Sequence, residues 1–350
     1  MGGQAISRGL PEVFKEDKLS RQPKFSYGGQ AVIEGIMIRG RSHFSLAVRR
    51  EDGTISHVQE PLNTLFTGKV RRVPLLRGFL ALVETLSLGI KALHQSANMA
   101  MVDQTPEGEK EMSSWVLAGT LGISLLLGVG IFFVLPQLIV TPIHPFLPSD
   151  LVINIIEGFF RLAILVGYIW AIGFIKNIRR VFAYHGAEHM AVHTYEAGLP
   201  LSIENVRKFE TPHPRCGTAF LLTVVLVSIL VFIFLGWPEL HWRILSRIAL
   251  LPLIAAVSYE IIRFSGLHQS WWIAKQVAAP GLLLQRLTTR QPDDGQIEVA
   301  ISAMESAIAA DAGQEYVVRF PAPAEELSLA EGGAEVSLSS ANTDAAQRLC

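Results

Sequence analysis

Three histidines and two glutamates recur at helical spacing in one stretch of the chain. Successive residues of a helix turn by about 100°, so His185, Glu188, His189, His193 and Glu196 would share an arc of roughly 140°. The first part reads H-x-x-E-H, an order in which two histidines bind zinc and the glutamate serves as general base. The pattern predicts a metal site. A solvated helix face beside a membrane is the competing interpretation.

Further candidate ligands lie before and after apolar stretches that follow in the chain. His213 and Cys216 precede the apolar run that begins at Gly217, and Glu260 closes the next such run. Zinc accepts imidazole, thiolate and carboxylate ligands, and a catalytic zinc site keeps one position for water. We expect His185 and His189 to bind the metal together with His213 or Glu260.

Each candidate in this set also has an alternative role. Cys216 is the fourth ligand if the site is closed and structural, or a small buried apolar residue. His213 precedes Pro214 and could cap a turn, and Glu260 could hydrogen-bond to loop groups. His193-x-x-Glu196 repeats the spacing of His185-x-x-Glu188, so a second metal ion stays open. Glu188 is the predicted base that activates water.

The composition is that of a membrane protein. Of the 350 residues 50% are hydrophobic and only 17% are charged, and the mean hydropathy is +0.35, which is too apolar for an ordinary soluble protein. The net charge of -1 gives no reason to expect nucleic acid as a partner. The two cysteines, Cys216 and Cys350, offer no disulfide framework and suit a reducing compartment.

Four stretches are apolar enough to cross about 30 Å of hydrocarbon. They are Trp115 to Val140, Leu151 to Ile175, Gly217 to Trp237 and Ile244 to Ile262. Glu157 and Arg161 in the second stretch are four apart and can pair on one helix face. Arg247 in the fourth lies near one end, where its side chain can snorkel to the interface.

Positive charge predicts the orientation of these spans. The 176–216 loop and the stretch after the fourth span are rich in Lys and Arg, whereas the two connections on the other side carry only Arg243. Positive loops remain in the cytoplasm. We therefore expect a multi-pass protein of the bacterial inner membrane with both termini and the His/Glu loop in the cytoplasm.

Outside the spans the sequence predicts a small β unit and amphipathic segments. Residues 27–60 read as strands, with Glu51-Asp52-Gly53 as a hairpin turn. Pro74 to Met99 reads as a helix whose polar residues Arg77, Glu84, Lys91 and Asn98 recur every seven positions, so it should lie in the membrane interface or pack on other membrane helices. Glu34 would be a solvent-facing strand residue or a buried functional carboxylate.

The fold class is therefore mainly α, a polytopic membrane protein with about four transmembrane helices, an amphipathic interfacial helix and a small N-terminal β unit. Its expected parts are a flexible arm (1–26), a cytoplasmic β unit with the amphipathic helix (27–112), and a four-span membrane domain (113–265) with the His/Glu loop (176–216). A cytoplasmic amphipathic segment (266–310) and a disordered tail (311–350) follow.

Several motifs together resemble the bacterial YqhQ family. They are Gly29-Gln30-Ala31-Val32-Ile33-Glu34-Gly35, Arg77-Gly78 with Glu84, Arg179 to His189, His213-Pro214-Arg215-Cys216-Gly217-Thr218, Tyr259-Glu260, Pro280-Gly281, and Leu284 to Arg290. The resemblance covers roughly residues 25 to 308. The family is a group of uncharacterised membrane proteins labelled predicted metal-dependent enzymes. The resemblance thus implies a metal site and leaves the substrate open.

Two functional hypotheses of different classes follow. The first is a membrane-embedded enzyme, a hydrolase that uses a divalent metal ion, zinc by our expectation, at the cytoplasmic face. The second is a non-catalytic membrane factor that binds or regulates other membrane proteins, with a structural metal or none. In both hypotheses the lipid bilayer is a partner.

Overall fold

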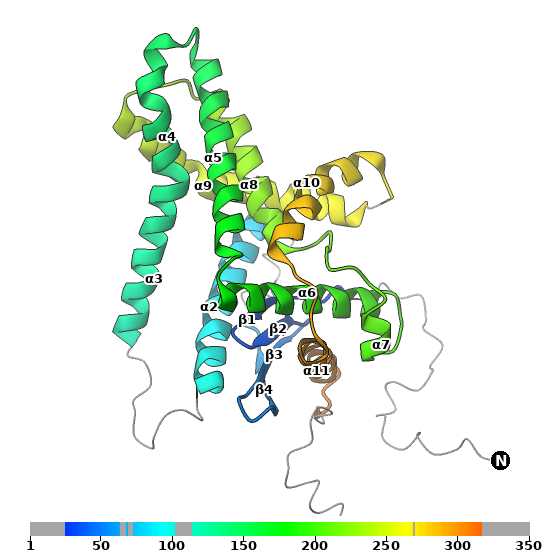
Figure 1. The fold of residues 1–350 in the computed structure, drawn as a ribbon. Coiled ribbons are helices and arrows are strands. Elements are labelled where there is room, and N and C mark those ends of the chain that lie inside the picture. Colours follow the sequence, from blue (N-terminus) through cyan, green and yellow to red (C-terminus); the bar gives the residue numbers. More distant parts are fainter. Residues whose placement is uncertain (1–24, 64–67, 69–72, 102–113, 269, 317–350) are drawn as a thin grey trace, which may run out of the picture.

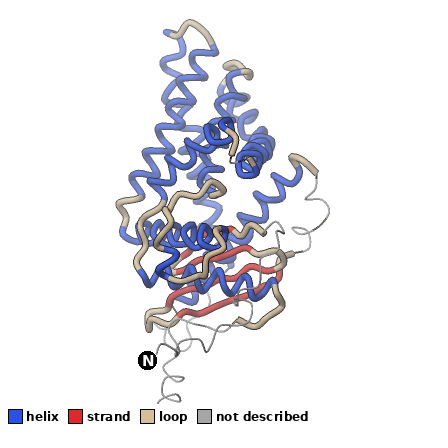
Figure 2. The backbone as a smooth tube through the Cα atoms, turned by 90° about the vertical axis from the view of Figure 1, so that its right-hand side faces the viewer, coloured by secondary structure: helices blue, strands red, loops and turns tan. Residues whose placement is uncertain are grey.

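The computed structural model describes residues 25–63, 68, 73–101, 114–268 and 270–316. The chain is mainly helical, with one antiparallel sheet near its N-terminal end. Long helices extend away from the sheet, and α6 (Lys176–Glu196) lies across their ends (Figure 1). The strands gather at the opposite end from the α4–α5 connection (Figure 2). The predicted arm (1–26) and tail (311–350) lie almost wholly outside the described residues.

The predicted β unit is confirmed as a four-stranded sheet in the order β1-β2-β3-β4. Its strands are β1 (Gly28–Val32), β2 (Gly35–Arg39), β3 (His43–Arg49) and β4 (Ile55–Pro61). The residue before β2, Glu34, has a φ of +50°, which occurs in turns rather than strands. Its carboxylate accepts a hydrogen bond of 2.7 Å from Arg180 Nε of α6. Glu34 is therefore a turn residue that ties α6 to the sheet, and neither predicted role applies.

Both faces of the sheet are covered by helices. Ile36, Ile38 and Ala47 point into a core shared with α6 and α11 (Asp294–Asp311). The alternate residues Met37, Leu46 and Val48 pack against α2 (Leu76–Met101). Successive side chains of a strand point to opposite faces, so apolar residues at every position of β2 follow from burial on both sides.

The prediction of an amphipathic segment from 266 to 310 is wrong for its second half. The chain forms α10 (Trp272–Thr288) and then, after a break, α11. Asp293 caps α11 in a capping box with Gln296. The helix is buried nearly all round, and Ser306 on it meets Ser45 of the sheet at 2.7 Å. It belongs to the core because it packs against both the sheet and α6.

The polar stripe of α2 faces the rest of the protein. Arg77 forms an ion pair with Glu260 of α9 (Leu240–Leu267). Glu84 accepts a hydrogen bond from Arg39 Nη2 of β2 at 2.9 Å, and Lys91 pairs with Glu60 of β4. The predicted helix is confirmed, and its stripe joins it to both the sheet and α9.

The structure shows three helical segments long and apolar enough to cross a membrane: Gly122–Phe146, Asp150–Ile172 and Leu240–Leu267. The first combines the second half of α3 (Ser114–Val129), the π-helix η4 (Gly130–Val134), α4 (Leu135–Val140) and the 3-10 helix η5 (Thr141–Phe146). The other two are α5 and α9. The fourth predicted span is α8 (Gly217–Ile233), which is apolar but has only 17 residues, about 26 Å at 1.5 Å per residue.

Several charged residues of the spans lie in the bundle interior. Glu157 and Arg161 of α5 form the predicted pair, at 2.5 Å. Arg247 of α9 does not snorkel to the interface: it is 1% exposed and lies 3.3 Å from Glu157 Oε2. An interior carboxylate attracts the guanidinium inward, because an ion pair is the main compensation for leaving water.

Gly186 lets α6 approach the segment after α10, where Arg290 N donates to the Phe182 carbonyl at 2.9 Å. A Cβ at Gly186 would lie 2.2 Å from the Arg290 carbonyl oxygen. Gly186→Ala should therefore lower the free energy of unfolding by about 1–3 kcal/mol. A Cβ at Gly167 of α5 meets nothing within 4 Å, so Gly167→Ala is the matched control and should be neutral or stabilising. Thermal unfolding in detergent measures both, and equal melting temperatures would contradict the close approach.

Candidate metal centre

Helix α6 is buried on two sides. Ala187, Met190 and Ala191 pack into the core beneath the sheet and α11. On the other side His189 is 2% exposed and the neighbouring Glu188 is 4% exposed. The interpretation of a solvated face is therefore wrong for these residues, because the 211–217 segment and the end of α10 cover them.

Each of the two histidines has one ring nitrogen fixed by a backbone carbonyl. His185 Nδ1 lies 2.9 Å from the Thr288 carbonyl oxygen, and His189 Nδ1 lies 2.5 Å from that of Thr211. A carbonyl oxygen only accepts, so both Nδ1 atoms carry the proton and both Nε2 atoms present a lone pair. The same arrangement orients histidines that bind metals.

The lone pairs converge on Cys216. Its Sγ lies 3.1 Å from His185 Nε2, and the rings of His185 and His189 are 4.3 Å apart. One ligand atom from each of the three residues lies within 4.8 Å of the others. Burial lowers the pKa of His189, which favours the neutral imidazole that a metal ion binds.

Cys216 is positioned by the start of α8. It is the N-cap residue of that helix, and Thr218 N donates to its Sγ at 3.4 Å. Cys216 is both a buried residue, at 6% exposure, and a candidate third ligand, because its Sγ lies within 4.8 Å of a ligand atom of each histidine.

A second group stands beside the first. His193, Glu196 and His213 also offer ligand atoms within 4.8 Å of one another. The His213 ring lies 4.5 Å from that of His193 and 5.6 Å from that of His189. Glu196 also forms an ion pair with Arg215.

His213 is prepared as a proton donor rather than as a ligand through Nε2. Its Nδ1 accepts from the Arg215 backbone N–H at 3.2 Å, so the neutral ring carries its proton on Nε2, 3.5 Å from Glu196 Oε2. Gln285 holds the His213 backbone from both sides, by bonds of 2.7 and 2.9 Å. Burial lowers the pKa of His213 and keeps the ring neutral.

Glu188 lines a small pocket of about 50 Å³ that His185, His189, His213 and Cys216 also line. Its Oε1 accepts a hydrogen bond of 2.8 Å from Gly29 N of β1. Burial raises its pKa, and the nearby His185 and His213 oppose that shift. Other residues that line the pocket are Tyr27, Gly28, Val192, Arg215 and Gly217. A carboxyl group with a raised pKa beside three imidazoles is equipped to exchange protons.

Glu260 does not join this group. Its carboxylate accepts from Arg77 Nε at 2.7 Å and from Leu75 N at 3.2 Å. Because the arginine of α2 binds Glu260 near the C-terminal end of α9, the expected grouping of Glu260 with His185 and His189 is wrong. Glu260 instead has the alternative predicted role, because it accepts a hydrogen bond from the loop before α2.

Four supporting residues were not identified from the sequence: Gly29, Thr211, Gln285 and Thr288. Gln285 is fully buried in α10, and its place in the motif from Leu284 to Arg290 is the signal that could have indicated it. The other three act through backbone groups, which leave no trace in residue type.

Comparisons with known proteins place the chain in a family. The family model described as "Protein of unknown function (DUF1385)" matches residues 73–310. The "Uncharacterized protein YqhQ" of Bacillus subtilis (strain 168) is 34% identical over 288 residues, which cover 79% of this chain and 91% of that protein. No solved structure matches the chain. The α6 histidines lie within the residues that the family model matches, and the chain belongs to the YqhQ family of uncharacterised proteins.

Proposed function

We propose that the protein is a membrane-bound, metal-dependent hydrolase with one zinc ion held by His185, His189 and Cys216. One observation carries the proposal: two imidazoles with Nδ1 bonded to backbone carbonyls direct both Nε2 atoms toward one thiol. A buried helix does not need this arrangement for packing, because apolar side chains would fill the same space at lower cost.

The donor set suits zinc. Two nitrogens and a thiolate are ligands that zinc prefers, and three protein ligands with an open fourth position are typical of catalytic zinc sites. A bound zinc ion would polarise a substrate carbonyl or phosphoryl oxygen and lower the pKa of water to about 7. With both Nδ1 atoms bonded to carbonyls, the imidazoles can bind through Nε2 without losing a proton, so the Cys216 thiol is the donor that gives one up.

The remaining residues of the pocket supply proton transfer. Glu188, held by Gly29 N, is the proposed base that takes a proton from the attacking water. His213, with its proton on Nε2, is suited to return one to the leaving group. Arg215 lines the same pocket and can hold an anionic part of the substrate.

For the whole chain we propose four spans in the bacterial inner membrane, with both termini, the sheet and α6 in the cytoplasm. The fourth span is α8, which packs with α5, α9 and α10 inside the bundle. A helix enclosed by others tolerates a small mismatch with the bilayer thickness. The Lys and Arg residues of 176–216 support the orientation.

Metal analysis tests the ligands. Protein purified in detergent should hold about one zinc ion per chain, and His185→Ala/His189→Ala should abolish it. The exposed His241 offers a matched control, because His241→Ala removes an imidazole without touching the site. After exchange with cobalt, a thiolate-to-cobalt charge-transfer band should be present and should vanish in Cys216→Ser. Full metal content in the double variant would contradict the proposed ligands.

The variant Glu188→Gln separates an enzyme from a non-catalytic membrane factor. Glutamine keeps the oxygen that accepts from Gly29 N but cannot take a proton. Metal content and unfolding temperature should change little, and activity should fall by about 10²–10⁴-fold, seen as failed complementation of a deletion strain. Complementation at the wild-type level would favour the membrane factor.

Labelling tests the orientation. With Cys216 buried and Cys350 replaced by serine, a single cysteine is introduced as Phe146→Cys or Lys208→Cys, both at exposed positions. An impermeant maleimide added to whole cells should label the first and spare the second until the cells are opened. The reverse pattern would exclude the proposed orientation.

A further inference from the structure

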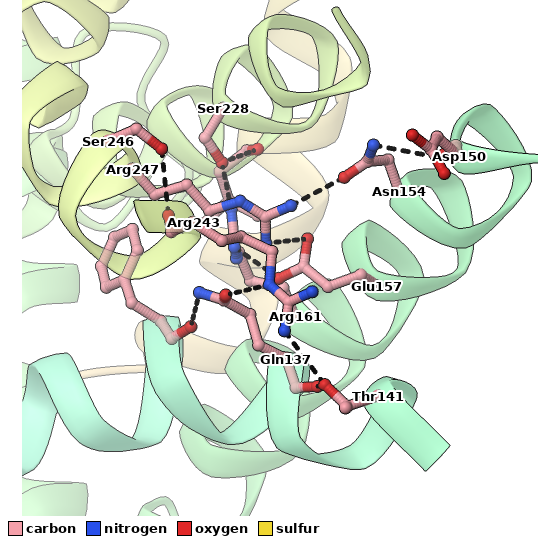
Figure 3. Close-up of polar contacts among 12 residues, drawn as sticks. Gln137, Thr141, Asp150, Asn154, Glu157, Arg161, Ser228, Arg243, Ser246 and Arg247 are labelled. Carbon is pink, nitrogen blue, oxygen red and sulfur yellow. Dashed lines mark hydrogen bonds and ion pairs between the residues drawn. The ribbon is translucent and has the colours of Figure 1, made fainter. Parts of the chain in front are cut away.

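A group of arginines lies inside the helical bundle, far along α8 from the candidate metal centre. Arg161 of α5 and Arg243 and Arg247 of α9 surround Glu157 (Figure 3). None of the three guanidinium side chains is more than 3% exposed. We call these four residues the arginine cluster.

Neutral groups provide most of its contacts. Arg161 Nη1 donates to Ser228 Oγ at 3.0 Å, and Arg247 Nη2 donates to Asn154 Oδ1 at 2.7 Å. Arg243 donates to Gln137 Oε1 at 2.9 Å and to Thr141 Oγ1 at 3.1 Å (Figure 3).

Aromatic rings complete the surroundings. The Arg243 guanidinium lies 3.7 Å from the Trp237 ring centroid, and those of Arg161 and Arg247 lie 4.9 and 5.0 Å from that of Phe232.

Positive charge exceeds negative charge in the cluster. Among the described residues, Glu157 is the carboxylate that pairs with these arginines, through Arg161 and Arg247. Three cations therefore face one anion. Asp150 at the start of α5 is more than half exposed and accepts from Trp237 N. Burying a cation without a counter-charge is costly. The excess of two positive charges therefore favours the binding of a further anion.

Two guanidinium nitrogens are available to bind this further anion. Within the described part of the chain, Arg161 Nε and Arg247 Nη1 are buried without a hydrogen-bond partner, and Arg247 Nη1 has only its ion pair with Glu157 at 3.3 Å. A buried donor that lacks a partner is rare in folded proteins. Both donors belong to side chains at most 1% exposed and both lie beside Glu157, so they mark one place in the bundle.

Helix α9 is long enough for its start to reach the phosphate layer of a bilayer. It has 28 residues, about 42 Å, and exceeds the hydrocarbon thickness of about 30 Å. Its first two turns carry Arg243 and Arg247, at the end of α9 opposite the Glu260–Arg77 pair. The exposed Trp242 beside them is typical of residues at a membrane interface.

We propose that the arginine cluster binds the phosphate group of an anionic ligand. Guanidinium groups recognise phosphate through paired N–H donors, and a phosphate group offsets about one of the excess positive charges as a phosphodiester or about two as free phosphate. The headgroup of an anionic phospholipid and free phosphate share this chemistry. The site lies at the opposite end of α8 from Cys216, so it is independent of the metal centre.

Ligand-dependent stability measures binding directly. Delipidated protein in detergent is melted with phosphatidylglycerol, with phosphatidylcholine, or with inorganic phosphate, against chloride at equal ionic strength. A ligand that binds the folded state raises the melting temperature. Phosphatidylglycerol should raise it and phosphatidylcholine should not, because choline already balances that phosphate. A rise with inorganic phosphate alone would support the site with free phosphate as its source.

Variants that remove a positive charge and a variant that removes a negative charge should have opposite effects on binding, which tests the site. Arg243→Gln/Arg247→Gln should lose the rise in melting temperature, whereas Glu157→Gln, which removes the competing carboxylate, should keep or enlarge it. Arg263→Gln, at the exposed other end of α9, is the charge-matched control and should respond like the wild type. Zinc content reports whether each variant is folded. The proposal is overturned if no phosphate-bearing anion raises the melting temperature of the wild type, or if the arginine variant keeps the rise.

Discussion

The rest of the structure depends on how α6 satisfies its polar groups while buried on two sides. One side joins the core of the sheet and α11, and the other carries His185, Glu188 and His189. Each of these groups is bonded to a backbone atom from a different segment. Since an unpaired buried polar group is costly, these bonds fix the positions of the sheet, the 211–217 segment and α10 relative to α6.

Ion pairs connect the sheet with the helices at several points. Glu34 in the β1–β2 turn binds Arg180 of α6, and Arg39 of β2 binds Glu84 of α2. Arg77 at the start of α2 then binds Glu260 of α9. The partly exposed pairs contribute little energy individually, but each has a defined partner and so selects one orientation of the apolar helices, whose packing alone is less specific.

The two ends of α8 carry opposite kinds of chemistry. Cys216 caps its first turn beside the imidazoles, and Ser228, three turns later, receives a hydrogen bond from Arg161. Side chains that can bind a cation therefore lie at the end of α8 near the sheet, whereas the arginines lie toward its opposite end. Both groups are held by helices that cross the bundle, which makes their geometry rigid.

The sequence alone determined the features that follow from local periodicity. Helical spacing placed His185 and His189 on one face and paired Glu157 with Arg161, and the Glu51-Asp52-Gly53 turn predicted the β3–β4 hairpin. Only the tertiary structure decided that Cys216 rather than Glu260 meets the histidines, that α11 is a core helix, and that Arg247 points inward. These outcomes depend on contacts between segments far apart in the chain. Residue type and spacing limit such contacts, whereas packing and charge compensation select among them.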